Sequence, residues 1–140
     1  MPTQSIWMIR ISLGYLLVAS LIGSLLLIHK VIEIHPSIWA LLPLHFEMAI
    51  WGWIVQFVMG TAYWIFPRYL QSMPRGSEKI AWVVVVLLNS GFLFLIADHL
   101  FGFDPLLKLS GRILITASIG CFVAIMWKRV VSYRNLEHNH

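Results

Sequence analysis

Residues 80–97 read IAWVVVVLLNSGFLFLIA, a stretch with no charged side chain. A helix needs about 20 mostly apolar residues to cross the hydrocarbon core of a bilayer, so this stretch predicts a membrane-spanning helix. Three further uncharged runs have a similar length, and they occupy residues 11–28, 48–66 and 113–127. Extending each run to the membrane interface predicts four spanning helices, at roughly 6–28, 42–66, 79–101 and 106–130.

The composition of the whole chain agrees with a membrane protein. Of its 140 residues, 59% are hydrophobic and only 11% are charged, whereas a soluble domain carries about 25% charged residues. This excludes a soluble enzyme, a disordered tail and a nucleic-acid-binding module. The single cysteine, Cys121, excludes an internal disulfide and a cysteine-rich metal site. We expect one all-α transmembrane domain over residues 1–140, folded as an antiparallel up-down four-helix bundle.

The segments between the runs contain turn signals and most of the basic residues. Residues 72–77 and 103–105 resemble tight connections, and the longer 29–42 segment predicts a short interfacial element beginning near His35-Pro36. Seven basic residues fall on one predicted side, namely Arg10, Arg68, Arg75, Lys79, Lys128, Arg129 and Arg134. Three fall on the other, namely Lys30, Lys108 and Arg112. The positive-inside rule therefore predicts that both termini and the 67–79 loop are cytoplasmic. The expected location is the inner membrane of a prokaryote.

A few ionisable residues lie within the predicted spans, where each costs about 2.5–3.5 kcal/mol at a helix centre. His45 and His99 fall about one turn from the predicted outer surface, on neighbouring helices. Two facing histidines of a helix bundle hold a low-spin haem b in many proteins, and this ligation suits electron transfer. Lys108 and Arg112 lie at the same level and are candidates to pair with haem propionates. Glu47 or Asp98 is a candidate to orient an imidazole.

The second predicted helix also carries a face of small residues. Steps of three and four residues from His45 reach Gly52, Gln56 and Gly60, which would let a flat macrocycle or another helix approach closely. Simpler interpretations remain open for each group. The small residues would serve helix packing, Lys108 and Arg112 would extend to the interface, and the loop histidines His29 and His35 would be exposed.

One segment resembles a known family. Pro43-Leu44-His45, Gly52, Gln56, Gly60-Thr61-Ala62-Tyr63-Trp64 and Arg68 occur in that order without a gap. This segment resembles the second transmembrane helix of the catalytic subunit of haem-copper oxidases, in the branch of the cbb-type cytochrome c oxidases and nitric oxide reductases. The resemblance implies that His45 is an axial ligand of a low-spin haem b.

The resemblance covers about 26 of the 140 residues, and the family's catalytic subunit has about a dozen helices. Four helices cannot build its copper-containing oxygen-reducing site, so we do not expect an independent oxidase. The expected function is that of a small haem b protein in electron transfer or in a respiratory complex, with quinol or a periplasmic cytochrome as a possible redox partner. The alternatives are a haem-based sensor or gas-binding protein and a haem-free structural or assembly subunit.

The second axial ligand is open between three sources. It is His99 of the same chain, His45 of a second copy, or a histidine of a partner membrane subunit. Accordingly, the expectation is one haem b per chain or one haem shared between chains.

Overall fold

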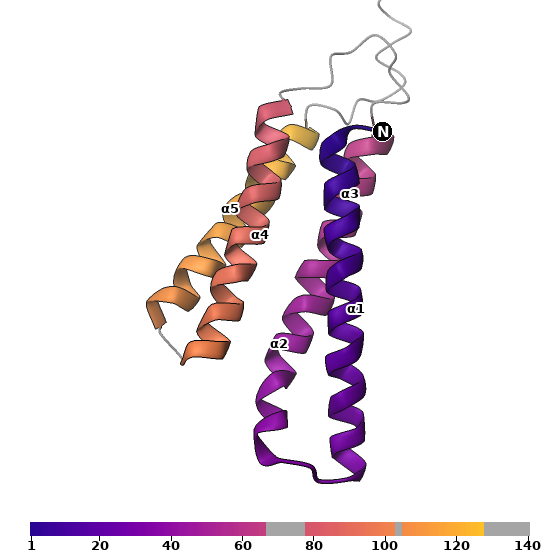
Figure 1. Ribbon diagram of the computed structural model, residues 1–140. Coiled ribbons are helices and arrows are strands. Elements are labelled where there is room, and N and C mark those ends of the chain that lie inside the picture. Colours follow the sequence, from indigo (N-terminus) through magenta and orange to yellow (C-terminus); the bar gives the residue numbers. More distant parts are fainter. Residues whose placement is uncertain (67–77, 103–104, 128–140) are drawn as a thin grey trace, which may run out of the picture.

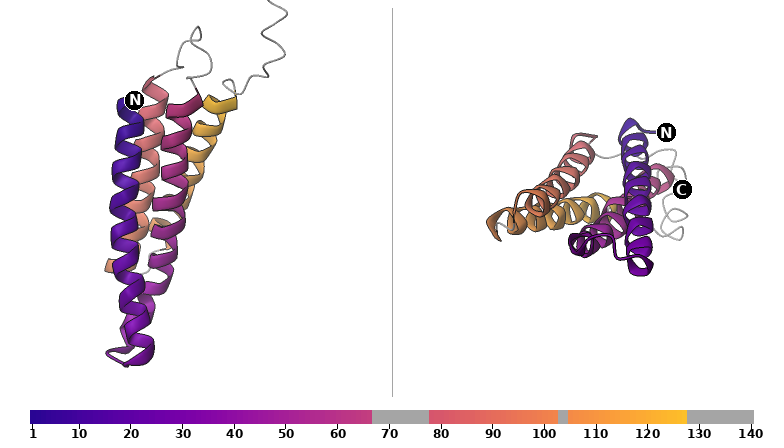
Figure 2. Two further views of the ribbon diagram at one scale, coloured as in Figure 1. Left: turned by 90° about the vertical axis from the view of Figure 1, so that its right-hand side faces the viewer. Right: turned by 60° about the horizontal axis from the view of Figure 1, so that its bottom comes forward.

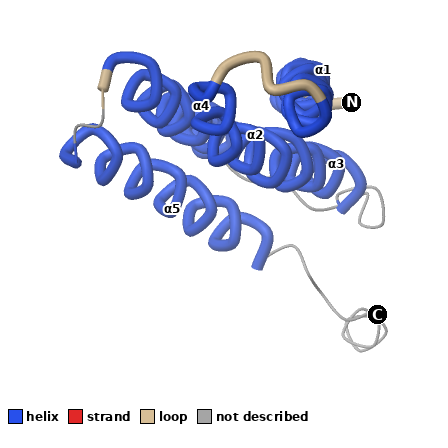
Figure 3. The backbone as a smooth tube through the Cα atoms, turned by 90° about the horizontal axis from the view of Figure 1, so that it is seen from below, coloured by secondary structure: helices blue, strands red, loops and turns tan. Residues whose placement is uncertain are grey.

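The computed structural model describes residues 1–66, 78–102 and 105–127, and every regular element within them is a helix (Figures 1 and 3). The elements are α1 (Thr3–Val31), η1 (Pro36–Leu41), α2 (Leu42–Glu47), η2 (Met48–Val55), α3 (Gln56–Ile65), α4 (Glu78–Phe101) and α5 (Pro105–Trp127). Together they form four helical segments that are long and apolar enough to cross a membrane, over Thr3–Val31, Pro36–Ile65, Glu78–Phe101 and Pro105–Trp127.

These bounds confirm the four predicted spans, with differences at the ends. The first helix continues to Val31, so His29 and Lys30 belong to it and not to a loop. The short element predicted near Pro36 is a 3₁₀-helix, which proline favours because its fixed φ suits the first helical position. The predicted connections at 72–77 and 103–104 lie outside the described residues, as do Arg68, Arg75, Lys128, Arg129 and Arg134.

The second span contains a π-helical stretch, η2, between α2 and α3. In a π-helix each N–H bonds to the carbonyl five residues earlier, and such stretches are rare outside functional or strained positions. Hydropathy does not reveal this stretch, because the residues from Met48 to Val55 are as apolar as those of an ordinary spanning helix.

The four spans are arranged as two pairs. The α2–η2–α3 span lies along α1, and α5 lies along α4 (Figures 1 and 2). Within the second pair the backbones of Gly91 and Gly111 meet, since a Cβ added to Gly91 would lie 2.8 Å from the Gly111 carbonyl oxygen. Buried Ser118 of α5 also donates to the Val84 carbonyl of α4, at 2.8 Å. Small residues and a hydroxyl thus hold this pair together, as they do in many membrane proteins.

One apolar core joins the two pairs. It contains side chains from α1, α3, α4 and α5, namely Met8, Met59, Val84, Val85, Leu88, Phe92, Leu95 and Ile115. Tyr15 of α1 reaches across to α4, where its ring lies 5.1 Å from that of Phe92 and its hydroxyl donates to Asn89 at 3.3 Å. Large apolar side chains remain exposed along every span, as expected for helices whose outer faces contact lipid.

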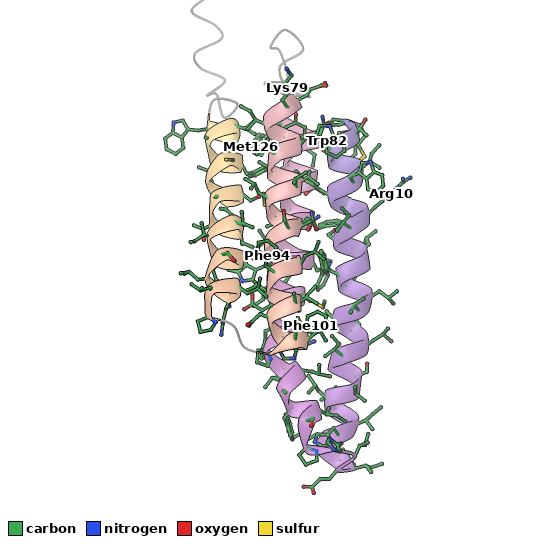
Figure 4. All side chains as sticks on the ribbon, turned by 60° about the vertical axis from the view of Figure 1, so that its left-hand side comes forward. Arg10, Lys79, Trp82, Phe94, Phe101 and Met126 are labelled. Carbon is green, nitrogen blue, oxygen red and sulfur yellow. The ribbon has the colours of Figure 1, made fainter. Side chains whose placement is uncertain are left out.

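The ends of the bundle differ in charge. Figure 4 shows Lys79 at the beginning of α4, with Arg10 of α1 and Met126 of α5 toward the same end and Phe101 at the opposite end. Lys108 and Arg112, by contrast, lie in the first turns of α5, beside the end of α4. Arg10 and Lys79 thus lie toward one end of the described helices, and Lys108 and Arg112 lie at the other end of the α4–α5 pair.

Candidate functional site

His45 packs against α1. Its Nδ1 lies 2.9 Å from the carbonyl oxygen of Ala19. The ring also packs closely against Gly23, because a Cβ added to this glycine would clash with His45 Cε1. A carbonyl can only accept, so Nδ1 carries the proton in this contact. In neutral imidazole Nε2 then has a free lone pair, which is the arrangement that a metal-binding histidine requires.

Two other histidines have the opposite arrangement. His29 Nδ1 accepts from the backbone N–H of Ile34 at 3.1 Å, and His35 Nδ1 accepts from that of Ser37 at 3.3 Å. When neutral, each of these rings carries its proton on Nε2, which cannot then bind a metal. Of these three histidines, His45 alone has an unprotonated Nε2 when it is neutral.

The prediction that His29 is exposed is wrong. Its side chain is only 3% exposed because α1 extends past it and the ring packs edge-on against Trp39, with centroids 5.6 Å apart. His35 is exposed, as predicted.

A pocket of about 230 Å³ lies between the two helix pairs, near the ends of α4 and α2 and the beginning of α5. Its walls are Trp39, Ala40, Pro43, Leu44, Glu47, Leu95, Asp98, His99, Lys108 and Arg112. The sequence predicted that polar residues gather at one level, and this pocket brings together Glu47, Asp98, His99, Lys108 and Arg112. His45 does not line it.

Glu47 and Arg112 form an ion pair across the pocket. Both guanidinium Nη atoms donate to the carboxylate, one of them at 3.0 Å, so α2 is tied to α5 by a bidentate contact. The Glu47 side chain is 19% exposed and that of Arg112 is 44% exposed. Arg112 was predicted to bind a propionate, and Glu47 was a candidate to orient an imidazole. Each has the other as its partner in this structure.

Asp98 is the buried charge of the pocket. It is 5% exposed, and its Oδ1 has no hydrogen-bond partner. A buried carboxylate oxygen without a donor is costly, by about 1–3 kcal/mol or more, so this atom indicates a missing donor. Asp98 is adjacent in sequence to His99, which lines the same pocket.

Gly52 and Gln56 face α1. The space beside Gly52 is filled by Tyr15, whose Cγ would lie 2.7 Å from an added Cβ. Gln56 is fully buried, and neither of its amide atoms has a hydrogen-bond partner. The small-residue face therefore serves the packing of α1, while Gln56 retains unused hydrogen-bonding groups.

The described residues contain no cluster of three or more His, Cys, Asp or Glu side chains that would hold a metal ion. A haem requires only one or two such ligands, and the tautomer of His45 fits this role. Sequence reasoning did not identify Ala19 and Gly23 as the residues that orient His45. Their signal is visible afterwards, because these two small residues lie one helical turn apart in a leucine-rich helix.

No protein-family model, curated protein or solved structure matches this chain. The similarity of residues 43–68 to the haem-copper oxidase helix therefore depends on those residues alone.

Proposed function

We propose that this chain is a small membrane-embedded haem b protein, related to the haem-copper oxidase catalytic subunit, in which His45 is an axial ligand. The observation that carries the proposal is the contact of His45 Nδ1 with the Ala19 carbonyl, 2.9 Å away, which leaves the Nε2 lone pair without a proton, as an iron ligand requires. The match of residues 43–68 to the family's ligand helix adds support. When bound, a haem b supplies reversible one-electron exchange at its iron.

The protein's own residues would act on the group in simple ways. The Ala19 carbonyl would fix the orientation of the imidazole, and Gly23 leaves room for the ring. Gln56 was predicted to bind the cofactor, but it is buried on the helix face that α1 covers, and its amide has no hydrogen-bond partner there. His99 and Lys108 are the further residues proposed to bind this haem, and they line the outer pocket, which His45 does not.

We place the chain in a prokaryotic inner membrane as an antiparallel up-down bundle with both termini in the cytoplasm. This topology follows from the positive-inside rule and from the shared end of Arg10 and Lys79 (Figure 4). His45 then lies toward the outer leaflet, within reach of a quinol or a periplasmic cytochrome. The chain acts in electron transfer or as a subunit of a respiratory complex, as a homo-oligomer or with a partner subunit.

A second candidate function is a haem-based sensor or gas-binding protein. The observation in its favour is that His45 faces α1 while His99 lines the pocket, which leaves one strong ligand per chain. A third candidate, a haem-free structural or assembly subunit, is favoured by the packing contacts of Arg112 and Gly52.

Absorption spectra of the purified full-length protein, oxidised and dithionite-reduced, test the proposal. We expect a b-type haem that is lost in His45→Ala but retained in the control His35→Ala, which removes an exposed imidazole near the same end. A colourless wild-type protein from haem-sufficient cells, or a His45→Ala variant with unchanged haem content, contradicts the proposal.

Two further measurements separate the versions of the proposal. If His99 is the second ligand, His99→Ala changes the low-spin spectrum, and an unchanged spectrum assigns the ligand to another chain. A six-coordinate haem resists carbon monoxide in the reduced state, so rapid binding of this gas favours the sensor.

A further inference from the structure

The outer pocket lies near one end of the α4 and α5 spans, where we expect the membrane interface. It is formed where α4 ends at Phe101 and α5 begins at Pro105, and this end of the α4–α5 pair lies beside α2 (Figures 1 and 2). Four exposed apolar residues lie within two positions of the lining residues His99 and Lys108 in the sequence, namely Leu100, Phe101, Leu106 and Leu109. A lipid can therefore reach the pocket sideways, with its acyl chains along these residues.

The pocket contains one negative and one positive group that are not paired with each other. Asp98 is buried with Oδ1 unsatisfied, and it requires an N–H or O–H donor. Lys108 is exposed and forms no ion pair within the described residues, whereas Arg112 is neutralised by Glu47. Among the described residues, a carboxyl group and an ammonium group therefore remain without an ion-pair partner at one cavity, which favours an occupant with a separate cation and anion.

We propose that this pocket binds the headgroup of phosphatidylethanolamine, with the lipid ammonium donating to Asp98 and the lipid phosphate accepting from Lys108. The ammonium offers three N–H donors to the Asp98 carboxyl group, whereas a choline headgroup offers none. A phosphatidylglycerol headgroup has the phosphate but no cation for Asp98. The pocket walls belong to both helix pairs, so the bound lipid joins them beside the Glu47–Arg112 ion pair.

This assignment does not depend on the proposed haem. A lipid in the pocket agrees with the versions in which the second axial ligand comes from another chain, and it competes with the version in which His99 binds iron. The lipid measurements below use no haem signal, so either proposal can fail while the other stands.

The first test uses the unmodified full-length protein in detergent. Native mass spectrometry is used to count retained lipids after equimolar addition of phosphatidylethanolamine, its N-monomethyl and N,N-dimethyl derivatives and phosphatidylcholine, all with the same acyl chains. We expect one retained phosphatidylethanolamine per chain, preferred over phosphatidylcholine by about tenfold, with a stepwise fall as N–H donors are removed. Equal retention across the series overturns the proposal.

The second test compares how two variants of the protein retain phosphatidylethanolamine and phosphatidylcholine. Asp98→Asn is expected to bring the ratio of phosphatidylethanolamine to phosphatidylcholine close to one. Lys108→Gln is expected to weaken both lipids alike and to leave the ratio unchanged, because both carry the phosphate. Glu33→Gln is the control, since Glu33 is exposed near the same end but does not line the pocket. If Asp98→Asn and Glu33→Gln change the ratio of the two lipids equally, the assignment is overturned. If Asp98→Asn fails to fold, the lipid series with the unmodified protein still tests the proposal.

Two competing occupants are tested in the same way. Glycerophosphoethanolamine has the same charges without acyl chains, and its displacement of the lipid at equal concentration would assign the pocket to a soluble phosphoethanolamine compound instead. A short-chain quinone is uncharged, and its retention in place of phosphatidylethanolamine would overturn the charge argument.

Discussion

Replacing Gly23 by alanine is the sharpest test of how His45 is held. A Cβ at this position would lie 2.7 Å from His45 Cε1 and 3.3 Å from Nδ1. A contact below 3.0 Å forces a shift, and the atom that shifts is at the end of a rotatable side chain, so the imidazole moves and the helices do not. The displaced ring loses its bond to the Ala19 carbonyl.

The expected effect on stability is small and that on ligand binding is large. Loss of one hydrogen bond costs about 0.5–1.5 kcal/mol, while alanine in place of glycine within a helix returns about 1 kcal/mol. These terms nearly cancel in the free energy of unfolding. A group that accepts a hydrogen bond from a metal-binding histidine, however, contributes about 10–100-fold to the affinity for the metal, so Gly23→Ala should weaken haem binding by a factor in this range.

The assay is a haem titration of the haem-free protein in detergent, combined with denaturation of the same samples. Gly14→Ala is the matched control on the same helix, because an added Cβ there has nothing within 4 Å. Nitrogen-15 NMR of the His45 ring provides a readout that needs no haem, since the wild type should carry its proton on Nδ1. If Gly23→Ala has the tautomer and the haem affinity of Gly14→Ala, then the Ala19 carbonyl does not orient His45.

The remaining predictions concern the contacts that hold the helices together. Gly111→Ala should lower the unfolding free energy by about 1–3 kcal/mol, because the new Cβ would lie 2.9 Å from the Gly91 carbonyl oxygen, a backbone atom that cannot turn away. In Gly120→Ala, on the same helix, the Cβ meets nothing within 4 Å, and equal stability of the two variants in denaturant titration would refute the close approach. Glu47→Gln and Arg112→Gln should each cost no more than about 1 kcal/mol, since the pair is partly exposed. A double-mutant cycle that finds no coupling between them would show that the ion pair does not tie α2 to α5.

The number and limits of the spans could be predicted from the sequence, because lipid requires long uncharged runs and places charges at their ends. The small-residue face of the second span was also recognisable from its spacing. The helix that packs against this face could not be predicted, because the spacing of residues along one helix contains no information about its neighbour. Gly52 contacts Tyr15 of α1, a residue more than thirty positions earlier.

For the candidate site, the sequence predicted the depth of the residues in the membrane but not the rotation of the helices that carry them. Hydropathy placed His45 and His99 at a similar depth, and the pocket does gather the polar residues of that level. Whether the imidazoles face each other depends on the rotation of each helix about its axis. The π-helical stretch after Glu47 changes this rotation within the second span, and no residue pattern announces it. His29 was misjudged for a related reason, because the end of α1 could be located only to within a turn.

The contacts between α1 and the second span follow one regular register, and this bears on where a cofactor can lie. Gly23 meets His45, Tyr15 meets Gly52, and Met8 meets Gly60, so both helices advance by seven or eight residues between contacts. Because each contact is close, α1 occupies the small-residue face along its whole length. A flat macrocycle therefore has no space at Gly52 while α1 is in place. The support for haem comes from the tautomer of His45. A haem bound to His45 must therefore approach from outside the contact surface between α1 and the second span.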